Sequence, residues 1–412
     1  MDIEKFIERA RVLINLNRKQ DAVKQLHEAL AYEPNNLYVI QLLCSCYYDL
    51  GNYKESLERA HEMISLSPDE ALGYYFLAIN YGVLDKNELA LKNIDIAISL
   101  DPWDADYFAY KAALYVDDKE WEKVIETTNE ALEIDPEHTN SLNHRITALT
   151  KLNRKDEILT HVAEVLASDP DNAYSHSTIG WSKLETKEYK EAQKHFAEAL
   201  RLDPNSNRAR IGMTNSIKGT NFLYSLVLRY SFWVNNHKGN IGWGIGIGVF
   251  VLSRFLKVLA AVSPIFLLLF VALFALIYFS WILNPISNLI LKFDKYGKYL
   301  LTPDEHKAVN IVSLGLVASI VSLLLLFTFH DDFFIYLAVF SGTIIIPFSN
   351  YYDTEPENQS QNVYYYSIIT ALVGFISLIM YFIFPEHWGI LGVLYLIGVI
   401  AFTWIRPILS SL

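Results

Sequence analysis

Six prolines stand at one constant interval in the first half of the chain, and no other feature restricts its fold as strongly. Each lies 34 residues after the one before: Pro34, Pro68, Pro102, Pro136, Pro170 and Pro204. A strict period of this length is typical of repeat arrays built from pairs of helices, in which no unit can bury its own core. The period predicts an all-α stacked solenoid, an architecture suited to holding other proteins.

Further positions inside each unit follow the same period. In the unit that ends near Pro102, Ala78 and Ala90 are small enough for two antiparallel helices to approach closely, and Tyr74 fills the space beside them. This pattern resembles the tetratricopeptide repeat (TPR) family. The resemblance covers six units from about residue 3 to 206 and a capping helix to residue 218.

The unit ending at Pro170 departs from this pattern. Ile146 and Ile158 occupy positions that hold small residues in the other units, and Arg145 precedes the first of them. Either looser packing or a side chain directed at a partner is expected there.

The resemblance also implies a concave surface lined by the first helix of each unit. The candidate partner-binding residues on it are Tyr38, Gln41, Tyr75, Phe76, Tyr110, Asn143, His144, Tyr174 and Trp181. Aromatic rings mixed with amides suit a peptide or helix, because they offer large contact area and hydrogen bonds. The alternative is that several of the tyrosines pack between neighbouring helices. TPR co-chaperones hold the acidic tail of Hsp70 or Hsp90 with a lysine at one set position of the first helix and an asparagine at another. No unit here has that lysine or that asparagine at the corresponding position, so no such tail is expected as partner.

The second half of the chain is mostly apolar and predicts a polytopic bundle of transmembrane helices. A bilayer crossing needs about 20 apolar residues. Six segments qualify, although five crossings remain an alternative: 241–262, 264–283, 308–329, 333–350, 364–384 and 388–409. The predicted domains are therefore a solenoid over 1–219, an interfacial linker helix over 220–240 and the bundle over 241–412. A break is expected at Asn284-Pro285, followed by a surface-lying segment. This half loosely resembles bacterial TPR membrane proteins of unassigned role.

The distribution of lysine predicts an orientation. Residues 284–307 carry four lysines, an excess that marks the cytoplasmic side. No basic stretch followed by an apolar one precedes the first helix, so no cleavable signal is expected and the repeats should be cytoplasmic, at a bacterial inner membrane. Arg254 and Lys257 interrupt the first apolar segment. They either contact an anionic lipid or a partner carboxylate, or extend to the membrane surface.

Several classes of function are not supported. The formal net charge of −12 lies largely in the repeats, which disfavours nucleic-acid binding. Cys44 and Cys46, the only cysteines, face different directions on one helix, so no metal site is expected. No catalytic motif and no cofactor-binding loop is found. The chain is predicted to be a membrane-anchored scaffold and not an enzyme. A TPR-regulated transporter, channel or lipid-handling protein is the alternative.

Overall fold

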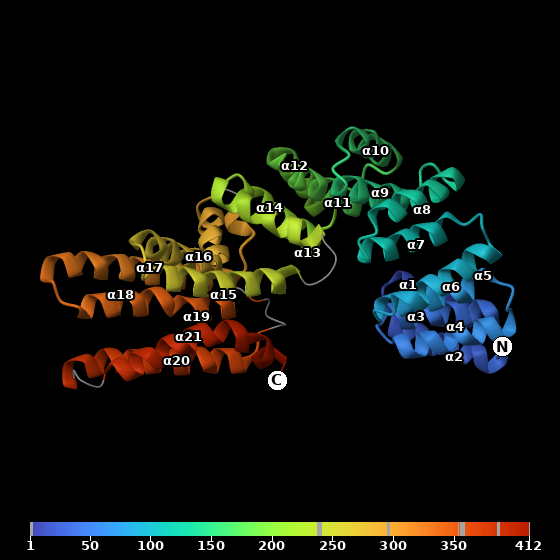
Figure 1. Ribbon diagram of the computed structural model, residues 1–412. Helices are drawn as coiled ribbons and strands as arrows, with labels where there is room; N and C mark the ends of the chain where they lie inside the picture. The colour runs from blue at the N-terminus through green and yellow to red at the C-terminus, as the bar shows by residue number, and fades with distance from the viewer. Residues whose placement is uncertain are drawn as a thin grey trace. The chain divides into compact units, whose positions relative to one another are not determined.

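The computed structural model describes residues 3–236, 241–294, 297–352, 354, 359–384 and 388–411, and every regular element in these ranges is a helix. The chain divides into two compact units. The first comprises Met1–Ala209 and Asn235–Lys238, and the second comprises Arg210–Val234 and Gly239–Leu412. The all-α class and the repeat architecture predicted from the sequence are confirmed (Figure 1).

The first unit consists of six helix pairs, coloured blue to green in Figure 1. In every pair the first helix has 13 residues and the second has 14. The pairs are α1 (Ile3–Asn15) and α2 (Lys19–Tyr32), α3 (Leu37–Asp49) and α4 (Tyr53–Leu66), α5 (Ala71–Val83) and α6 (Asn87–Leu100), α7 (Ala105–Asp117) and α8 (Trp121–Ile134), α9 (Thr139–Lys151) and α10 (Lys155–Ser168), α11 (Ala173–Glu185) and α12 (Tyr189–Leu202).

One left-handed residue turns the chain inside each pair, and these residues recur with the same period of 34. They are Asn17, Gly51, Asp85, Lys119, Asn153 and Lys187, with φ between 55° and 76°. The next backbone N–H closes the end of the first helix; that of Arg18, for example, donates to the oxygen of Leu13 at 2.8 Å. This geometry is a standard helix C-terminus, in which glycine or asparagine is favoured.

We expect the left-handed positions to respond in opposite directions to substitution. Lys187→Gly should stabilise α11 and α12 by about 0.5–1 kcal/mol, because a side chain at positive φ is strained. Gly51→Ala should destabilise α3 and α4 by a similar amount, although a Cβ there meets no atom within 4 Å. Amide hydrogen exchange of the helices on either side measures both changes. If both variants gained stability, or both lost it, strain at positive φ could not explain the changes.

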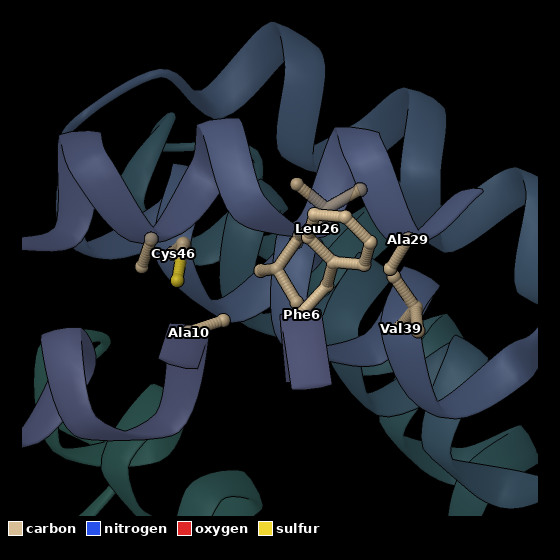
Figure 2. Close-up of a cluster of buried hydrophobic side chains, with 8 residues drawn as sticks. Phe6, Ala10, Leu26, Ala29, Val39 and Cys46 are labelled. Atoms are coloured by element: carbon tan, nitrogen blue, oxygen red, sulfur yellow. The ribbon is translucent and has the colours of Figure 1, made fainter. Parts of the chain in front are cut away.

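The core of the first unit lies between neighbouring pairs. One buried cluster joins Phe6 and Ala10 of α1, Leu26 and Ala29 of α2, and Cys46 of α3 (Figure 2). The alanines are fully buried, and their small side chains let the backbones of neighbouring helices approach closely. Each pair therefore depends on the next pair to cover its apolar face.

The unit ending at Pro170 packs more loosely, as expected. Helix α10 lies less closely against α9 and α11 than the other second helices lie against their neighbours. Ile146 and Ile158 are buried, and their branched side chains hold apart helices that alanine lets approach elsewhere. Arg145 donates from Nε to Nε2 of His161 at 2.9 Å and also contacts Asn129 of α8 in the preceding unit, so this side chain is used within the array of repeats.

The second unit is a bundle of longer helices, coloured from yellow-green to red in Figure 1. Three segments are long and apolar enough to cross a membrane: Pro303–Phe329, Phe333–Tyr352 and Gln361–Ile383, while Pro264–Phe279 and Gly389–Phe402 are shorter. The elements are α13 (Asn207–Gly219), α14 (Phe222–Asn236), α15 (Ile241–Leu259), α16 (Pro264–Phe293), η1 (Gly297–Tyr299), α17 (Pro303–Phe329), α18 (Phe333–Thr343), α19 (Ile345–Tyr352), α20 (Gln361–Ile383) and α21 (Trp388–Ser411). Six crossings remain a prediction.

Two helix starts agree with the sequence. Ser263 Oγ accepts from the backbone N–H of Ile265 at the start of α16. Thr302 and Glu305 form a reciprocal capping box at the start of α17, with Pro303 in the first turn. These caps satisfy N–H groups that a helix leaves unpaired at its first turn.

The expected break at Asn284-Pro285 is wrong, because α16 continues through it to Phe293. Proline removes one backbone hydrogen bond, and the turns on both sides hold a helix of 30 residues together. The segment after it does not lie free on a surface either. Leu291 is fully buried and packs with Ile217 of α13 and Leu301. The helix expected to cap the repeats therefore also packs within the second unit.

The segment expected over 333–350 is divided at Ile344 into α18 and α19. Gly315 of α17 allows this part to pack tightly. A Cβ on Gly315 would lie 2.1 Å from Cγ2 of Ile345 and 2.8 Å from the backbone oxygen of Ser341. Small residues at such contacts let membrane helices approach closely.

Candidate partner-binding surface of the repeats

The nine candidate residues differ in how much of each side chain a partner could reach. Tyr38 and Tyr174 are each 44% exposed. Partly buried side chains belong to Gln41, Tyr75, Tyr110, His144 and Trp181, whereas Phe76 and Asn143 are buried. All nine come from the first helices of their pairs, α3, α5, α7, α9 and α11.

The two buried candidates hold the repeats together. Phe76 packs in a core cluster with Ile40 and Met63. Asn143 donates from Nδ2 to the backbone oxygen of Thr139 at 2.9 Å and to Oγ of Ser175 at 2.8 Å, which joins α9 to α11. Substituting either residue would disturb folding, so neither can report on partner binding.

Tyr75 is the centre of an aromatic cluster. The Tyr75 ring centroid lies 5.1 Å from the Tyr107 centroid and 5.8 Å from the Tyr110 centroid. The rings of Tyr75 and Tyr110 meet edge-on. Tyr110 Oη donates to the backbone oxygen of Ala78 at 3.2 Å. Gly82 makes room for the Tyr110 hydroxyl, since a Cβ on Gly82 would lie 2.2 Å from Oη of Tyr110. The rings are thus fixed in place before any partner binds.

Carboxylates surround these rings. Burial, followed by the charges of Asp106 and Asp104, raises the pKa of Tyr75 to about 12. Burial also raises the pKa of Tyr110, with Tyr48, Tyr75 and Asp117 as smaller causes. The phenols are therefore neutral at pH 7, and that of Tyr110 already donates to the backbone oxygen of Ala78.

At the other end of the repeats the candidates contact the start of α13. Trp181 Nε1 donates to the backbone oxygen of Arg208 at 3.3 Å. The Arg208 guanidinium lies 5.1 Å from the ring centroid of Tyr174. Burial, followed by the charges of Arg208 and His138, lowers the pKa of His144 to about 4, so this imidazole is neutral at pH 7. Tyr174 is therefore already in contact with a cation of its own chain. The aromatic candidates on α3, α5 and α7 are Tyr38, which is exposed, and Tyr75 and Tyr110, which are partly buried.

Arg254 and Lys257 lie near the end of α15, and both are exposed. The Arg254 guanidinium is 5.3 Å from the ring centroid of Phe250, one turn earlier in the same helix. Within the ranges that the structure describes, no carboxylate forms an ion pair with either residue. Their place in the last turns suits side chains that extend to the membrane surface.

The two cysteines are buried, and burial raises the pKa of each thiol to about 11. Cys44 Sγ donates to the backbone oxygen of Ser56 at 3.3 Å. A thiol with so high a pKa is a poor nucleophile at neutral pH. In the part of the chain covered by the structure, His, Cys, Asp and Glu form no group of three that could hold a metal ion.

Comparisons with known proteins agree with the period of 34. Two sequence families described as tetratricopeptide repeat match, one over residues 11–78 and one over residues 173–206. No curated protein matches the chain.

Solved structures of repeat proteins resemble it. MamA is 21% identical, covering 41% of this chain and 96% of its own, with a TM-score of 0.35. A tetratricopeptide repeat protein from Parabacteroides merdae is 14% identical over 52% and 84% of the two chains, with a TM-score of 0.46. PilW, a type IV pilus biogenesis factor, is 13% identical over 51% and 97%, with a TM-score of 0.44. The family matches and the six helix pairs together identify the first half of the chain as a segment of tetratricopeptide repeats.

Proposed function

We propose that this protein is a membrane-anchored scaffold whose repeats bind a protein or peptide and hold it at the membrane. The observation that carries the proposal is the set of aromatic side chains on the first helices α3, α5 and α7, of which Tyr38 is exposed and Tyr75 and Tyr110 are partly exposed. Tyrosine and tryptophan contribute most to protein interfaces, because they bury large areas at small cost in conformational entropy. In this proposal the chain binds a partner and catalyses no reaction.

The second unit serves as the anchor in this proposal. Hydroxyl groups among its helices donate to backbone oxygens of neighbouring helices. Tyr278 Oη donates to Gly342 at 2.5 Å, Ser319 Oγ to Ala338 at 2.8 Å and Tyr366 Oη to Gly398 at 2.8 Å. Polar groups used in this way join helices and do not line a path for a solute.

One observation favours the lipid-handling alternative. A cavity of about 200 Å³ lies among α18, α20 and α21, with Phe340, Leu378 and Leu396 in its mostly apolar lining. Part of one acyl chain would fit a space of this size and character. A specific lipid that co-purifies with the protein and is lost in a Leu378→Trp variant would support this alternative over the scaffold.

Site-specific photo-crosslinking tests the scaffold in membranes of cells that make the protein. A benzophenone amino acid in place of Tyr38 on α3 should give a discrete adduct with one protein. The matched control is the same substitution at Leu159 of α10, which is 60% exposed. We expect no adduct there, because α10 is a second helix. Equal adducts at both positions, or none at either, would exclude a partner on this surface.

We also propose that the repeats are cytoplasmic and that the loop before α18 lies on the opposite side. The buried native cysteines give little background, so single new cysteines can be labelled with a membrane-impermeant maleimide. Asp332→Cys should react in intact cells, whereas Leu159→Cys should react only after permeabilisation. Both positions are exposed. The reverse pattern would overturn the orientation.

A further inference from the structure

The acidic surplus of the whole chain comes from two consecutive repeats. Residues 69–137, which include helices α5 to α8, carry 17 Asp and Glu residues and 5 lysines. The rest of the chain carries 29 acidic residues and 29 basic ones, so it has no net charge. The charge is concentrated where the aromatic cluster of Tyr75 lies. A surface with this potential attracts cations and repels acidic peptides.

Three of the five lysines of this stretch make contacts elsewhere. Lys111 pairs with Asp95 of α6 at 2.8 Å. Lys86 lies 5.9 Å from the ring centroid of Tyr81, and Lys123 lies 5.3 Å from that of Tyr115. None of these contacts involves a carboxylate next to Tyr75 or Tyr110.

Asp106 and Asp117 lie one turn before and two turns after Tyr110 on α7, and both are exposed. Within the described residues neither has a lysine or arginine partner. Asp106 pairs only with Nε2 of His138, at 3.1 Å. Asp117 has Asp118 and Asp85 as its charged neighbours, and burial together with these like charges raises its pKa. A cation from outside the chain would relieve this repulsion.

We propose that the surface formed by Tyr48, Tyr75, Tyr110, Asp106 and Asp117 binds a segment of a partner protein that carries lysine or arginine. The partner's cationic groups pair with the two aspartates, and their alkyl stems lie on the tyrosine rings. Such contacts combine charge attraction with the pull of an aromatic face on a cation. The proposal rests on the proposed scaffold function and names the chemistry of its partner. An acidic or uncharged peptide is an alternative occupant that the test distinguishes.

A random library of 12-residue peptides displayed on phage, selected on the full chain in detergent, tests this chemistry without assuming a sequence. We expect the selected peptides to be enriched in lysine and arginine next to apolar residues. Enrichment of acidic or uncharged peptides would overturn the cationic partner and leave the scaffold standing. No enrichment at all would overturn both proposals.

Affinity measurements on one selected peptide then locate the site. Asp106→Asn combined with Asp117→Asn should weaken binding about tenfold, since each exposed charge pair contributes up to about 1 kcal/mol. The matched control, Glu122→Gln with Glu126→Gln, makes the same change in net charge at exposed positions of α8 and should have less than a twofold effect. Equal effects of the two pairs would show attraction to net charge alone and would overturn the site.

A second pair of variants tests the rings. Tyr75→Phe should keep the affinity within about twofold, because the aromatic face remains. Tyr75→Leu should weaken binding about fivefold, because leucine fills the space and lacks that face. Amide exchange of α5 and α7 verifies that both variants are folded. Equal affinity of the two variants would remove the rings from the binding surface.

Discussion

Phe196→Ala should lower the stability of the last helix pair by about 3–5 kcal/mol, the usual cost of removing a fully buried phenylalanine. Phe196 is among the largest fully buried side chains of the protein. Its ring lies against Gly180 of α11, where a Cβ would be 2.7 Å from Cε1, and meets Trp181 edge-on at 5.8 Å between centroids. The cavity cannot collapse easily, because backbone forms part of its wall.

Amide hydrogen exchange, read helix by helix, is the appropriate measurement, since a repeat array joined to a second folded unit does not unfold in two states. Protection of α11 and α12 should fall by the stated amount, whereas protection of α1 to α4 should not change. Leu159→Ala, at an exposed position of α10, serves as the control, with an expected change below about 0.5 kcal/mol. Loss of protection along the whole array would show that the repeats unfold as a single unit.

Acid should weaken the same helix pair well before most carboxylates titrate. His176 and His195 face each other with Nδ1 atoms 3.1 Å apart, and Nε2 of His176 lies 3.0 Å from the backbone oxygen of Pro170. That carbonyl can only accept, so Nε2 of His176 donates to it. A neutral His176 then accepts from His195 through Nδ1. His195 already carries a proton on the Nδ1 that faces His176, so a further proton enters at its Nε2 and leaves a charge on a partly buried ring.

The pH window follows from the pKa of His195. Burial, followed by the charge of His176, lowers this pKa to about 4, while an unfolded histidine titrates near 6.5. The unfolded state therefore binds more protons between these values. Stability from this group is complete above about pH 6.5 and is lost as the pH falls toward 4, by about 2–3 kcal/mol. The other charged groups acting on His195 are Lys183, Glu191 and Lys194.

Exchange protection of α11 and α12 at pH 7.0, 5.5 and 4.5 measures this loss. His195→Gln retains a side chain that can donate a hydrogen bond but cannot titrate in this range. We expect its protection to change less with pH, after correction for intrinsic exchange rates. If the exchange protection of His195→Gln fell with pH as steeply as that of the native chain, other groups would cause the acid effect.

The repeat architecture could be predicted from the sequence because one covalent constraint recurs. Each proline ends a second helix, so the helix boundaries followed directly from its position. The left-handed residues have the same period but vary in type. Asn17 and Gly51 are typical of such turns, whereas Lys119 and Lys187 have no preference for positive φ, which concealed the pattern.

The candidate surface was predicted only in part. The position of a residue within a repeat decides on which face of its helix the side chain lies, but not how deeply that side chain is buried. Asn143 has the spacing of a groove residue, yet its amide bonds to Ser175, 32 residues later. Tyr107 went unnoticed, since its place in the aromatic cluster depends on how α5 and α7 cross. The helix boundaries in the apolar second half of the chain were harder to predict from the sequence. Nothing local to Pro285 indicates that α16 passes through it.

The identical spacing of the left-handed turn residue and the proline has an evolutionary consequence. A duplication of 34 residues adds one complete step to the array and leaves every later turn in register. An insertion of any other length displaces the left-handed residue from the end of its helix. The number of repeats can therefore change by whole units while the second unit of the chain is preserved.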